Sequence, residues 1–252
     1  MPSMEEFEMK DIGFKEIAEY GIILESYRIL EYFIEQGIEF KTVSSYHLDY
    51  DWYLYKKNGV KIAVAVSQGA PMAVDLAERY KSSGIKYITR IGTTGALNKD
   101  LRLGEIALPI ASVKDEGTSN FYIESNAPAV ADLELFRKLE DKLKKNGEKV
   151  NVGISWSTDG RWKETDEMVR KYVSSGAIFA DMESSALFAF GLNRRVKVAS
   201  LSILSDEIQE DEGDAPKGLS DKDIWFDKVL PKMLVAFNNI VEVYEDIDKN
   251  KE

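Results

Sequence analysis

The feature that most constrains the fold is an alternation of short apolar runs with segments of helical periodicity. The runs have the length and composition of buried strands, and they lie at 21–24, 60–66, 85–89, 104–111, 150–155, 177–180 and 196–204. Because strands that alternate with helices build a mostly parallel sheet with helices on both faces, the sequence predicts an α/β fold.

Local signals define several turns and helix ends. Asn58-Gly59 between two β-rich runs predicts a hairpin, and Asp132 is expected to cap a helix. The last helix is expected over about 221–244. No linker or repeat interrupts the pattern. We therefore expect one domain over residues 1–252, with an N-terminal extension (1–18) and a charged tail (246–252).

Composition excludes several classes of function. The net charge of −11 argues against nucleic acid and anionic membranes as partners. Cysteine is absent, so the chain has no disulfide, thiol nucleophile or thiolate metal site. His47 is the sole histidine, which rules out a multi-histidine metal centre, and we expect no metal. No secretory signal or membrane-spanning run is visible, so we expect a cytoplasmic enzyme or binding protein.

The segment 90–96, Arg-Ile-Gly-Thr-Thr-Gly-Ala, follows one of the predicted strands. We expect it to form a turn, in which Gly92 and Gly95 let the backbone approach a ligand closely. Backbone N–H groups, two hydroxyls and the Arg90 guanidinium would then converge, and such donors suit an oxyanion such as phosphate. The alternative is an ordinary turn with Arg90 in a structural ion pair.

Other candidate ligands also follow predicted strands. In open α/β sheets, ligands bind at the carboxyl ends of the strands. We therefore expect one pocket that contains Arg28, Gln68-Gly69, 90–94, Glu116–Ser119, Trp162, Met182-Glu183 and Asp206.

In their order and spacing, the segments 90–96, Glu116–Ser119, Asp181–Ser184 and Ser205-Asp206 resemble the nucleoside phosphorylase family. This family holds uridine phosphorylases, hexameric purine nucleoside phosphorylases and related nucleosidases. The resemblance implies a three-layer α/β/α sandwich with a mixed, mostly parallel central sheet. It also implies cleavage of the N-glycosidic bond of nucleosides without a metal or organic cofactor, with inorganic phosphate as co-substrate. A homo-oligomer, either a dimer or a trimer of dimers, is expected.

The resemblance assigns Arg90, Thr93 and Arg28 to phosphate, with Arg90 also counted as catalytic because its charge balances the developing ribosyl cation. Arg28 departs from the family pattern. It follows Glu25-Ser26-Tyr27, whereas family members usually have Gly-Asp-Pro before the first phosphate arginine. The lost glycine removes an easy backbone approach, and the Glu25 carboxylate would repel phosphate.

The ribose site is assigned to Met182 and Glu183, because a carboxylate can accept hydrogen bonds from both the 2′- and 3′-hydroxyls. The alternative is that Asp181 and Glu183 only favour the first turn of a helix. The family also sends a basic residue into the neighbouring subunit's site. His47 is the candidate for that role here, although a lone histidine can equally be structural or exposed.

The base is assigned to Thr94, Gly95, Trp162 and Asp206. Asp206 would act as the acid toward N7 of a leaving purine, which requires a raised pKa, and its alternative is a cap of a helix or loop. Trp162 is a stacking surface or a packed core side chain. Segment 160–165 lacks the Gln-x-Arg pair of uridine phosphorylases, which favours purines over uracil.

The leading hypothesis is therefore a phosphate-dependent nucleoside phosphorylase that prefers purine nucleosides, with uridine as a further candidate. A nucleosidase that uses water is the nearest alternative, and Arg90 argues against it. A non-catalytic nucleoside-binding protein is the third.

Overall fold

The computed structural model describes residues 18–43, 51–206 and 222–250. In that part of the chain the strands are β1 (Tyr20–Leu24), β2 (Lys41–Val43), β3 (Trp52–Lys57), β4 (Val60–Val66), β5 (Tyr87–Ala96), β6 (Ile106–Asp115), β7 (Ala129–Val130), β8 (Val150–Thr158), β9 (Ala177–Asp181) and β10 (Lys197–Asp206). The α-helices are α1 (Tyr27–Glu35), α2 (Ala70–Ser82), α3 (Leu133–Lys145), α4 (Asp166–Ser174), α5 (Ser184–Arg194), α6 (Lys222–Ile224) and α7 (Leu230–Lys249). Short turns of 3-10 helix, η1 (Thr118–Phe121) and η2 (Arg161–Lys163), and a π-helical turn, η3 (Trp225–Val229), complete the elements.

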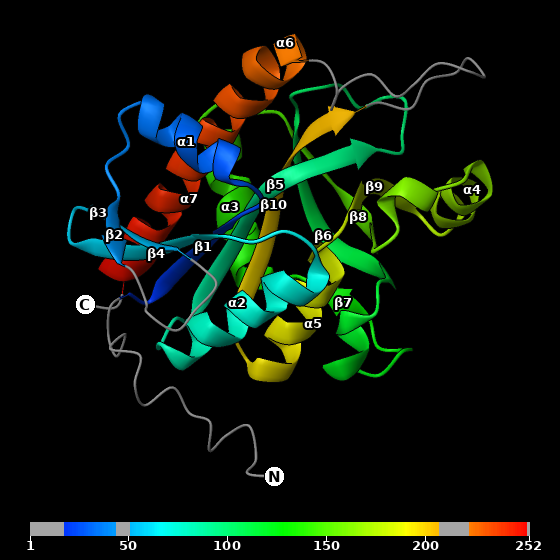
Figure 1. Cartoon of the computed structure of the whole chain (residues 1–252), viewed down its shortest axis with the longest axis horizontal. Coiled ribbons are helices and arrows are strands. Elements are labelled where there is room, and N and C mark those ends of the chain that lie inside the picture. The colour runs from blue at the N-terminus through cyan, green and yellow to red at the C-terminus, as the bar shows by residue number, and fades with distance from the viewer. Residues whose placement is uncertain (1–17, 44–50, 207–221, 251–252) are drawn as a thin grey trace.

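The strands form one mixed sheet in the order β10-β6-β8-β9-β5-β1-β4-β3-β2, with β7 beside β6 (Figure 1). Five of the described pairings are parallel and five are antiparallel, so the sheet is more mixed than the alternation of elements alone predicts. A further pairing joins β10 to β5. It closes β5, β10, β6, β8 and β9 into a ring, which the sequence pattern did not predict.

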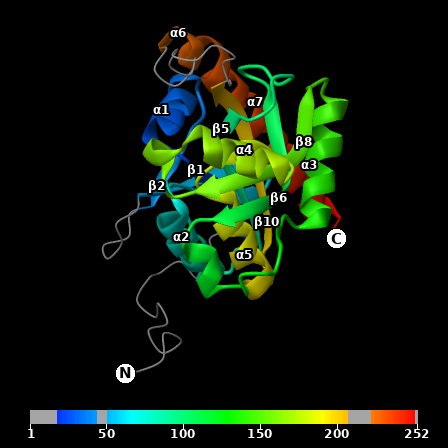
Figure 2. The ribbon, with the colours of Figure 1, turned by 90° about the vertical axis from the view of Figure 1, so that its right-hand side faces the viewer.

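Helices cover both faces of the sheet, as the sequence predicts. On one face α2 packs on α5, and α5 covers β6 and β10. On the other face α3 packs on α7, and α7 lies against β4, β5 and β10 (Figure 1). Seen from the side, α3 stands next to β8 (Figure 2). Central strand residues such as Ile22, Ile88 and Leu201 are fully buried between these layers. No helix in the described ranges combines the length and apolar character needed to cross a membrane.

Two local predictions are confirmed. Asn58 (φ 49°) and Gly59 (φ 87°) form the left-handed pair of a hairpin turn between β3 and β4. The Asp132 carboxylate accepts a hydrogen bond from the Leu135 N–H and caps α3. The last helix differs from its prediction, because α7 continues past Tyr244 to Lys249.

The prediction of a turn at 90–96 is wrong, because β5 runs without a break through that segment to Ala96. Gly92 and Gly95 are not among the glycines with positive φ in the described residues. Glycine is needed at these two positions because carboxylate side chains approach the backbone of β5 closely there. A Cβ at Gly92 would overlap the Glu25 carboxylate, and a Cβ at Gly95 would lie 2.6 Å from Asp206 Oδ2. The two glycines thus make room for the carboxylate of Glu25, just after β1, and for that of Asp206, at the end of β10, without bending the strand.

Candidate functional site

A cavity lies where the end of β10, the second half of β5 and the residues just after β1, β4, β8 and β9 come together. It is lined by eight of the residues predicted from the sequence, namely Gln68, Arg90, Thr93, Thr94, Gly95, Met182, Glu183 and Asp206. Glu25, Arg161 and Glu164, which were not among the predicted pocket residues, also line it. Four of the seven segments expected to share one pocket, namely Gln68-Gly69, 90–94, Met182-Glu183 and Asp206, thus contribute to its lining.

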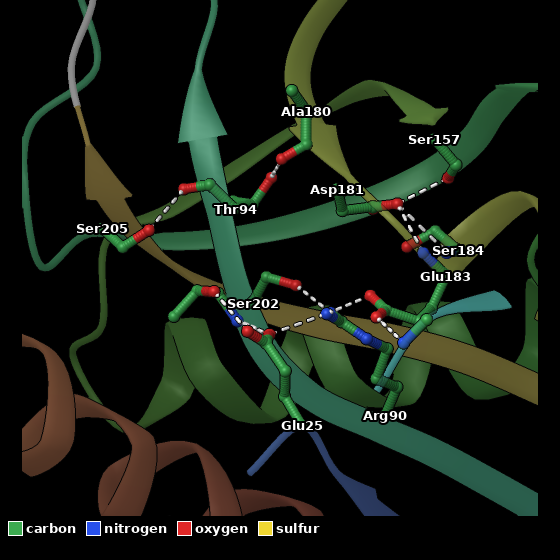
Figure 3. Close-up of polar contacts among 12 residues, drawn as sticks. Glu25, Arg90, Thr94, Ser157, Ala180, Asp181, Glu183, Ser184, Ser202 and Ser205 are labelled. Atoms are coloured by element: carbon green, nitrogen blue, oxygen red, sulfur yellow. Dashed lines mark hydrogen bonds and ion pairs between the residues drawn. The ribbon is translucent and has the colours of Figure 1, made fainter. Parts of the chain in front are cut away.

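Arg90 is the buried centre of this cavity. Side chains alternate along a strand. The hydroxyl of Thr89 lies 2.7 Å from the hydroxyl of Tyr244 in α7, so Arg90 points to the opposite face, toward the start of α5. Its guanidinium donates to Ser202 Oγ (2.9 Å), to Glu25 Oε2 (2.8 Å) and to Glu183 Oε2 (2.5 Å) (Figure 3). Burial opposes the charge, but the Glu183 and Glu25 carboxylates outweigh burial and raise the pKa of Arg90.

Glu25 accepts hydrogen bonds from the donors predicted to hold phosphate. The Thr93 N–H donates to Glu25 Oε2 (2.5 Å), and the Thr93 hydroxyl donates to Oε1 (2.7 Å). Arg90 supplies a third hydrogen bond to the same carboxylate (Figure 3). The sequence predicted that Glu25 would repel phosphate. The structure adds that this carboxylate itself occupies an oxyanion position.

Glu183 is a buried carboxylate between two donors. It lies between β9 and α5, its side chain is 2 % exposed, and its Oε1 accepts a hydrogen bond from the Gly69 N–H (2.6 Å). Burial raises the pKa of Glu183; Arg90 opposes this rise, whereas Glu25 and Asp181 add to it, and the pKa reaches about 7. The alternative role, in which an acidic side chain only favours the start of a helix, fits Asp181 and not Glu183. The Asp181 carboxylate accepts a hydrogen bond from the Ser184 N–H at the first turn of α5.

Asp206 ends β10 at the other side of the cavity. Its Oδ1 accepts a hydrogen bond from the Ser205 hydroxyl (2.8 Å). Burial raises the pKa of Asp206; the Ser205 hydrogen bond and Arg161 oppose this rise, and Glu25 adds to it. Glu164 is a second carboxylate at this end, and burial followed by the charge of Asp206 raises its pKa too. Thr94 lines the same region, but its hydroxyl donates to the Ala180 carbonyl (2.8 Å).

Arg28 does not line this cavity, so its assignment to phosphate stays a prediction that the structure does not support. α1 buries Ile29, Leu30 and Phe33, so Arg28 is on the exposed side of the first turn. Its guanidinium pairs with Glu31 (3.4 Å) and lies 4.7 Å from the centre of the Phe226 ring.

The loop at Glu116–Ser119 is also absent from the cavity lining. The Glu116 carboxylate accepts the N–H groups of Thr118 and Ser119 and the hydroxyl of Ser185, so it fastens this loop to α5. The expectation that it belongs to the pocket is wrong. His47 lies outside the described residues.

Trp162 lies in a wider cleft beside the inner cavity. Its side chain is 88 % exposed, so the alternative of a packed core residue is wrong. The cleft has a volume of about 490 Å³ and shares Gln68, Arg161 and Met182 with the inner cavity. The inner cavity holds only about 80 Å³, far less than the roughly 300–1,000 Å³ of most small-molecule sites. A ligand larger than a small anion would therefore extend from the inner cavity into the cleft.

The sequence profile of the Phosphorylase superfamily matches residues 19–235, which is most of the chain. The chain belongs to this superfamily. In the described ranges, no group of three or more histidine, aspartate and glutamate side chains is arranged to hold a metal ion.

Named relatives of this superfamily member act on different bases. The chain is 29 % identical over 133 residues to a guanosine phosphorylase of Halorubrum lacusprofundi, covering 53 % of this chain and 55 % of the relative. It is 33 % identical over 116 residues to a uridine phosphorylase of Thermococcus kodakarensis, covering 46 % and 42 %. The matched region thus spans about half the length of these curated relatives.

The fold is that of solved nucleoside phosphorylases. A crystal structure of uridine phosphorylase from Vibrio fischeri ES114 superposes with a TM-score of 0.77 at 23 % identity, covering 93 % of this chain and 95 % of that one. The likeness includes the mixed central sheet with helices on both faces.

Sequence reasoning missed what Glu25 and Glu164 contribute to the cavity. For Glu25 a signal was present. It directly follows the first predicted strand, and a buried arginine on a parallel neighbouring strand needs a carboxylate partner. Glu164 lies in a loop, where no periodicity reveals which way a side chain points.

Proposed function

We propose that the chain cleaves the N-glycosidic bond of nucleosides, with inorganic phosphate as co-substrate, to free base and (deoxy)ribose 1-phosphate. Purine nucleosides are the preferred substrates in this proposal, with uridine as a further candidate. The observation that supports this proposal most is that one cavity brings together three kinds of group: the anion donors of Arg90 and Thr93, the buried Glu183 carboxylate, and Asp206. Relatives named guanosine phosphorylase and uridine phosphorylase support it.

The anion end supplies the nucleophile in this scheme. A guanidinium, a backbone N–H and a hydroxyl already hold one oxyanion there, the Glu25 carboxylate, with donor–acceptor distances of 2.5–2.8 Å. Phosphate on the same donors would be fixed in position beside the sugar, and positioning of the reactants is a large part of catalysis for such a step. The positive charge of Arg90 would balance charge as the ribosyl cation develops.

The sugar and base would lie across Glu183, Met182 and Asp206. Glu183 as a carboxylate accepts hydrogen bonds from the two ribose hydroxyls, and Met182 packs on the sugar. In the reaction a phosphate oxygen bonds to C1′ as the bond from C1′ to the base nitrogen breaks, and a purine leaves with a proton from Asp206 on N7. Burial raises the pKa of Asp206, which favours the protonated form that this step needs. Thr94, Gly95 and Trp162 would line the base site.

The decisive experiment incubates the protein with inosine, guanosine, adenosine and uridine, each with and without inorganic phosphate. We expect base release that depends on phosphate, with ribose 1-phosphate as the second product and with the purine nucleosides turned over faster. Base release that ignores phosphate and yields free ribose would contradict the proposal.

Hydrolysis is a second candidate, and one observation favours it. The described lining of the inner cavity has two arginines but five carboxylates, from Glu25, Glu164, Asp181, Glu183 and Asp206. This excess of carboxylates disfavours the binding of a phosphate dianion, whereas it does not repel a neutral water molecule. The assay above separates the two reactions, because only hydrolysis produces free ribose.

Assembly and location complete the proposal. We expect a homo-oligomer, a dimer or a trimer of dimers, working in the cytoplasm on small molecules. Light scattering on the eluted protein gives the number of subunits, and a monomer would contradict this part.

A further inference from the structure

Glu25 offers an inference that rests on the proposed phosphate co-substrate and goes beyond it. We propose that its side chain is a built-in competitor for phosphate, so that residue 25 sets how tightly this chain binds its acceptor. The carboxylate occupies the oxyanion position while phosphate is absent, and phosphate enters when the Glu25 side chain rotates away.

The contacts of Glu25 are those of a bound oxyanion. Both carboxylate oxygens are used: Oε2 accepts from Arg90 and from the Thr93 N–H, and Oε1 accepts from the Thr93 hydroxyl. The side chain is 13 % exposed, so it is held inside the cavity and not on its rim. These donors cannot hold phosphate and Glu25 at once, because each of the two Thr93 donors has a single hydrogen to give.

The backbone around Glu25 is built for this position. The Glu25 N–H donates to the Ile91 carbonyl (3.0 Å), which fixes residue 25 beside β5. Across from it, Gly92 lacks the Cβ that would overlap the Glu25 carboxylate. The inward position therefore depends on Ile91 and Gly92 of β5 as well as on the Glu25 side chain itself.

Charge supports competition over joint binding. Arg90 already faces the Glu25 and Glu183 carboxylates at 2.8 and 2.5 Å. A phosphate dianion added to this arrangement would meet two carboxylates around one guanidinium. If the Glu25 side chain rotates away, its negative charge moves away from Arg90. Replacement of the Glu25 carboxylate by phosphate on these donors then becomes favourable.

The size of the effect follows from the population of the state with Glu25 turned away. Apparent affinity is the intrinsic affinity multiplied by the fraction of molecules that are competent to bind, and minor states of about 0.1–10 % are typical. Removing the competitor should therefore tighten phosphate binding by about 10- to 1,000-fold.

The test measures binding of inorganic phosphate, without nucleoside, by calorimetry on the full chain. Glu25→Ala removes the carboxylate, and Glu25→Gln keeps the size but not the charge, which provides a second variant if the first fails to fold. Glu35→Ala is the matched control, because Glu35 is an exposed residue at the end of α1. We expect tighter phosphate binding in both Glu25 variants and no change in the control.

Unchanged or weaker phosphate binding in folded Glu25 variants would overturn the inference, whatever the reaction is. A turnover assay then separates this failure from that of the proposed function. With the inference correct and phosphorolysis correct, the KM for phosphate falls at least 10-fold in Glu25→Ala, while the KM for the nucleoside stays within about twofold. Free ribose made by the unchanged chain without phosphate would refute phosphorolysis alone, since the binding measurement does not depend on turnover.

Discussion

At the scale of single residues, the main feature of the cavity is one guanidinium, that of Arg90, which forms ion pairs with two carboxylates. Arg90 contacts both Glu25 and Glu183, and the two acids are thus coupled through it. Burial of Glu183 raises its pKa, Arg90 opposes this rise and repulsion from Glu25 and Asp181 adds to it, so the pKa reaches about 7, against its usual value of 4.5. In the proposed function, binding of ribose by this carboxylate would therefore depend on pH near 7.

The first prediction concerns the pH profile. Because Glu183 becomes protonated below about pH 7, we expect kcat/KM for the nucleoside to fall as the pH is lowered through 7. The folded chain keeps this proton up to about pH 7, whereas the unfolded chain releases it near 4.5, so this group's contribution to stability falls as pH rises across that window. In Glu25→Ala the midpoint should move to lower pH, because one of the charges that raise it is gone. A flat profile between pH 5.5 and 8 would contradict the assignment.

The second prediction concerns Asp206. Asp206→Asn keeps the shape of the side chain but cannot give up a proton, so we expect kcat/KM for purine nucleosides to fall by about 10²- to 10⁴-fold. Phosphate binding should be unchanged, since Asp206 makes no contact with Arg90 or Thr93 among the hydrogen bonds of the described residues. Steady-state kinetics with inosine measure the effect, and Asp166→Asn, at an exposed position in α4, is the control. Purine kinetics equal to those of the unchanged chain would refute the acid role.

At the scale of elements, β5 is the strand on which the site depends. It pairs with β1, β9 and β10, and it carries Arg90, Thr93 and both site glycines. Its neighbours present Glu25 and Asp206 to the spaces that the glycines leave open. The site is thus assembled by the pairing of strands, and a side chain added to β5 would disturb it directly.

The third prediction tests this dependence. In Gly92→Ala the new Cβ would overlap the Glu25 carboxylate and lie 2.5 Å from Arg90 Cζ, so we expect a loss of stability of about 1–3 kcal/mol, as for overpacking elsewhere. Denaturant unfolding measures it. Gly117→Ala is the control, because Gly117 has φ −84° and the nearest atom to its Cβ would be 3.9 Å away. The loss should be smaller in a Glu25→Ala background, and equal losses in the two backgrounds would show that Glu25 is not the obstacle.

At the scale of the whole molecule, the sequence predicts the α/β class of the fold, but it does not predict that five strands of the sheet close into a ring. Apolar runs and helical periodicity give the strands and helices, and the Asn58-Gly59 turn gives one hairpin. The pairing of β10 with β5 joins segments about 110 residues apart, which no local pattern reveals. The continuous β5 was missed for a related reason: Gly92 and Gly95 usually signal turns, and only the positions of Glu25 and Asp206 in space explain them.

The candidate site was predictable where chemistry and strand ends coincide, as at Arg90, Glu183 and Asp206. It was not predictable where a helix face decides, as at Arg28, which α1 turns to the solvent. The sequence also could not show that the Glu25 carboxylate, expected to repel phosphate, would itself accept hydrogen bonds from Arg90 and Thr93, because that outcome depends on the pairing of β1 with β5.

The anchoring of β5 between three strands has a kinetic consequence. Its Thr93 N–H belongs to a backbone that moves only when the sheet opens, whereas rotation of a side chain takes picoseconds to nanoseconds at exposed positions and longer where it must break hydrogen bonds. An exchange between the Glu25 carboxylate and a free anion therefore requires no backbone rearrangement. The rate at which an anion replaces the Glu25 carboxylate is therefore expected to be limited by rotation of that side chain, while β5 stays in place.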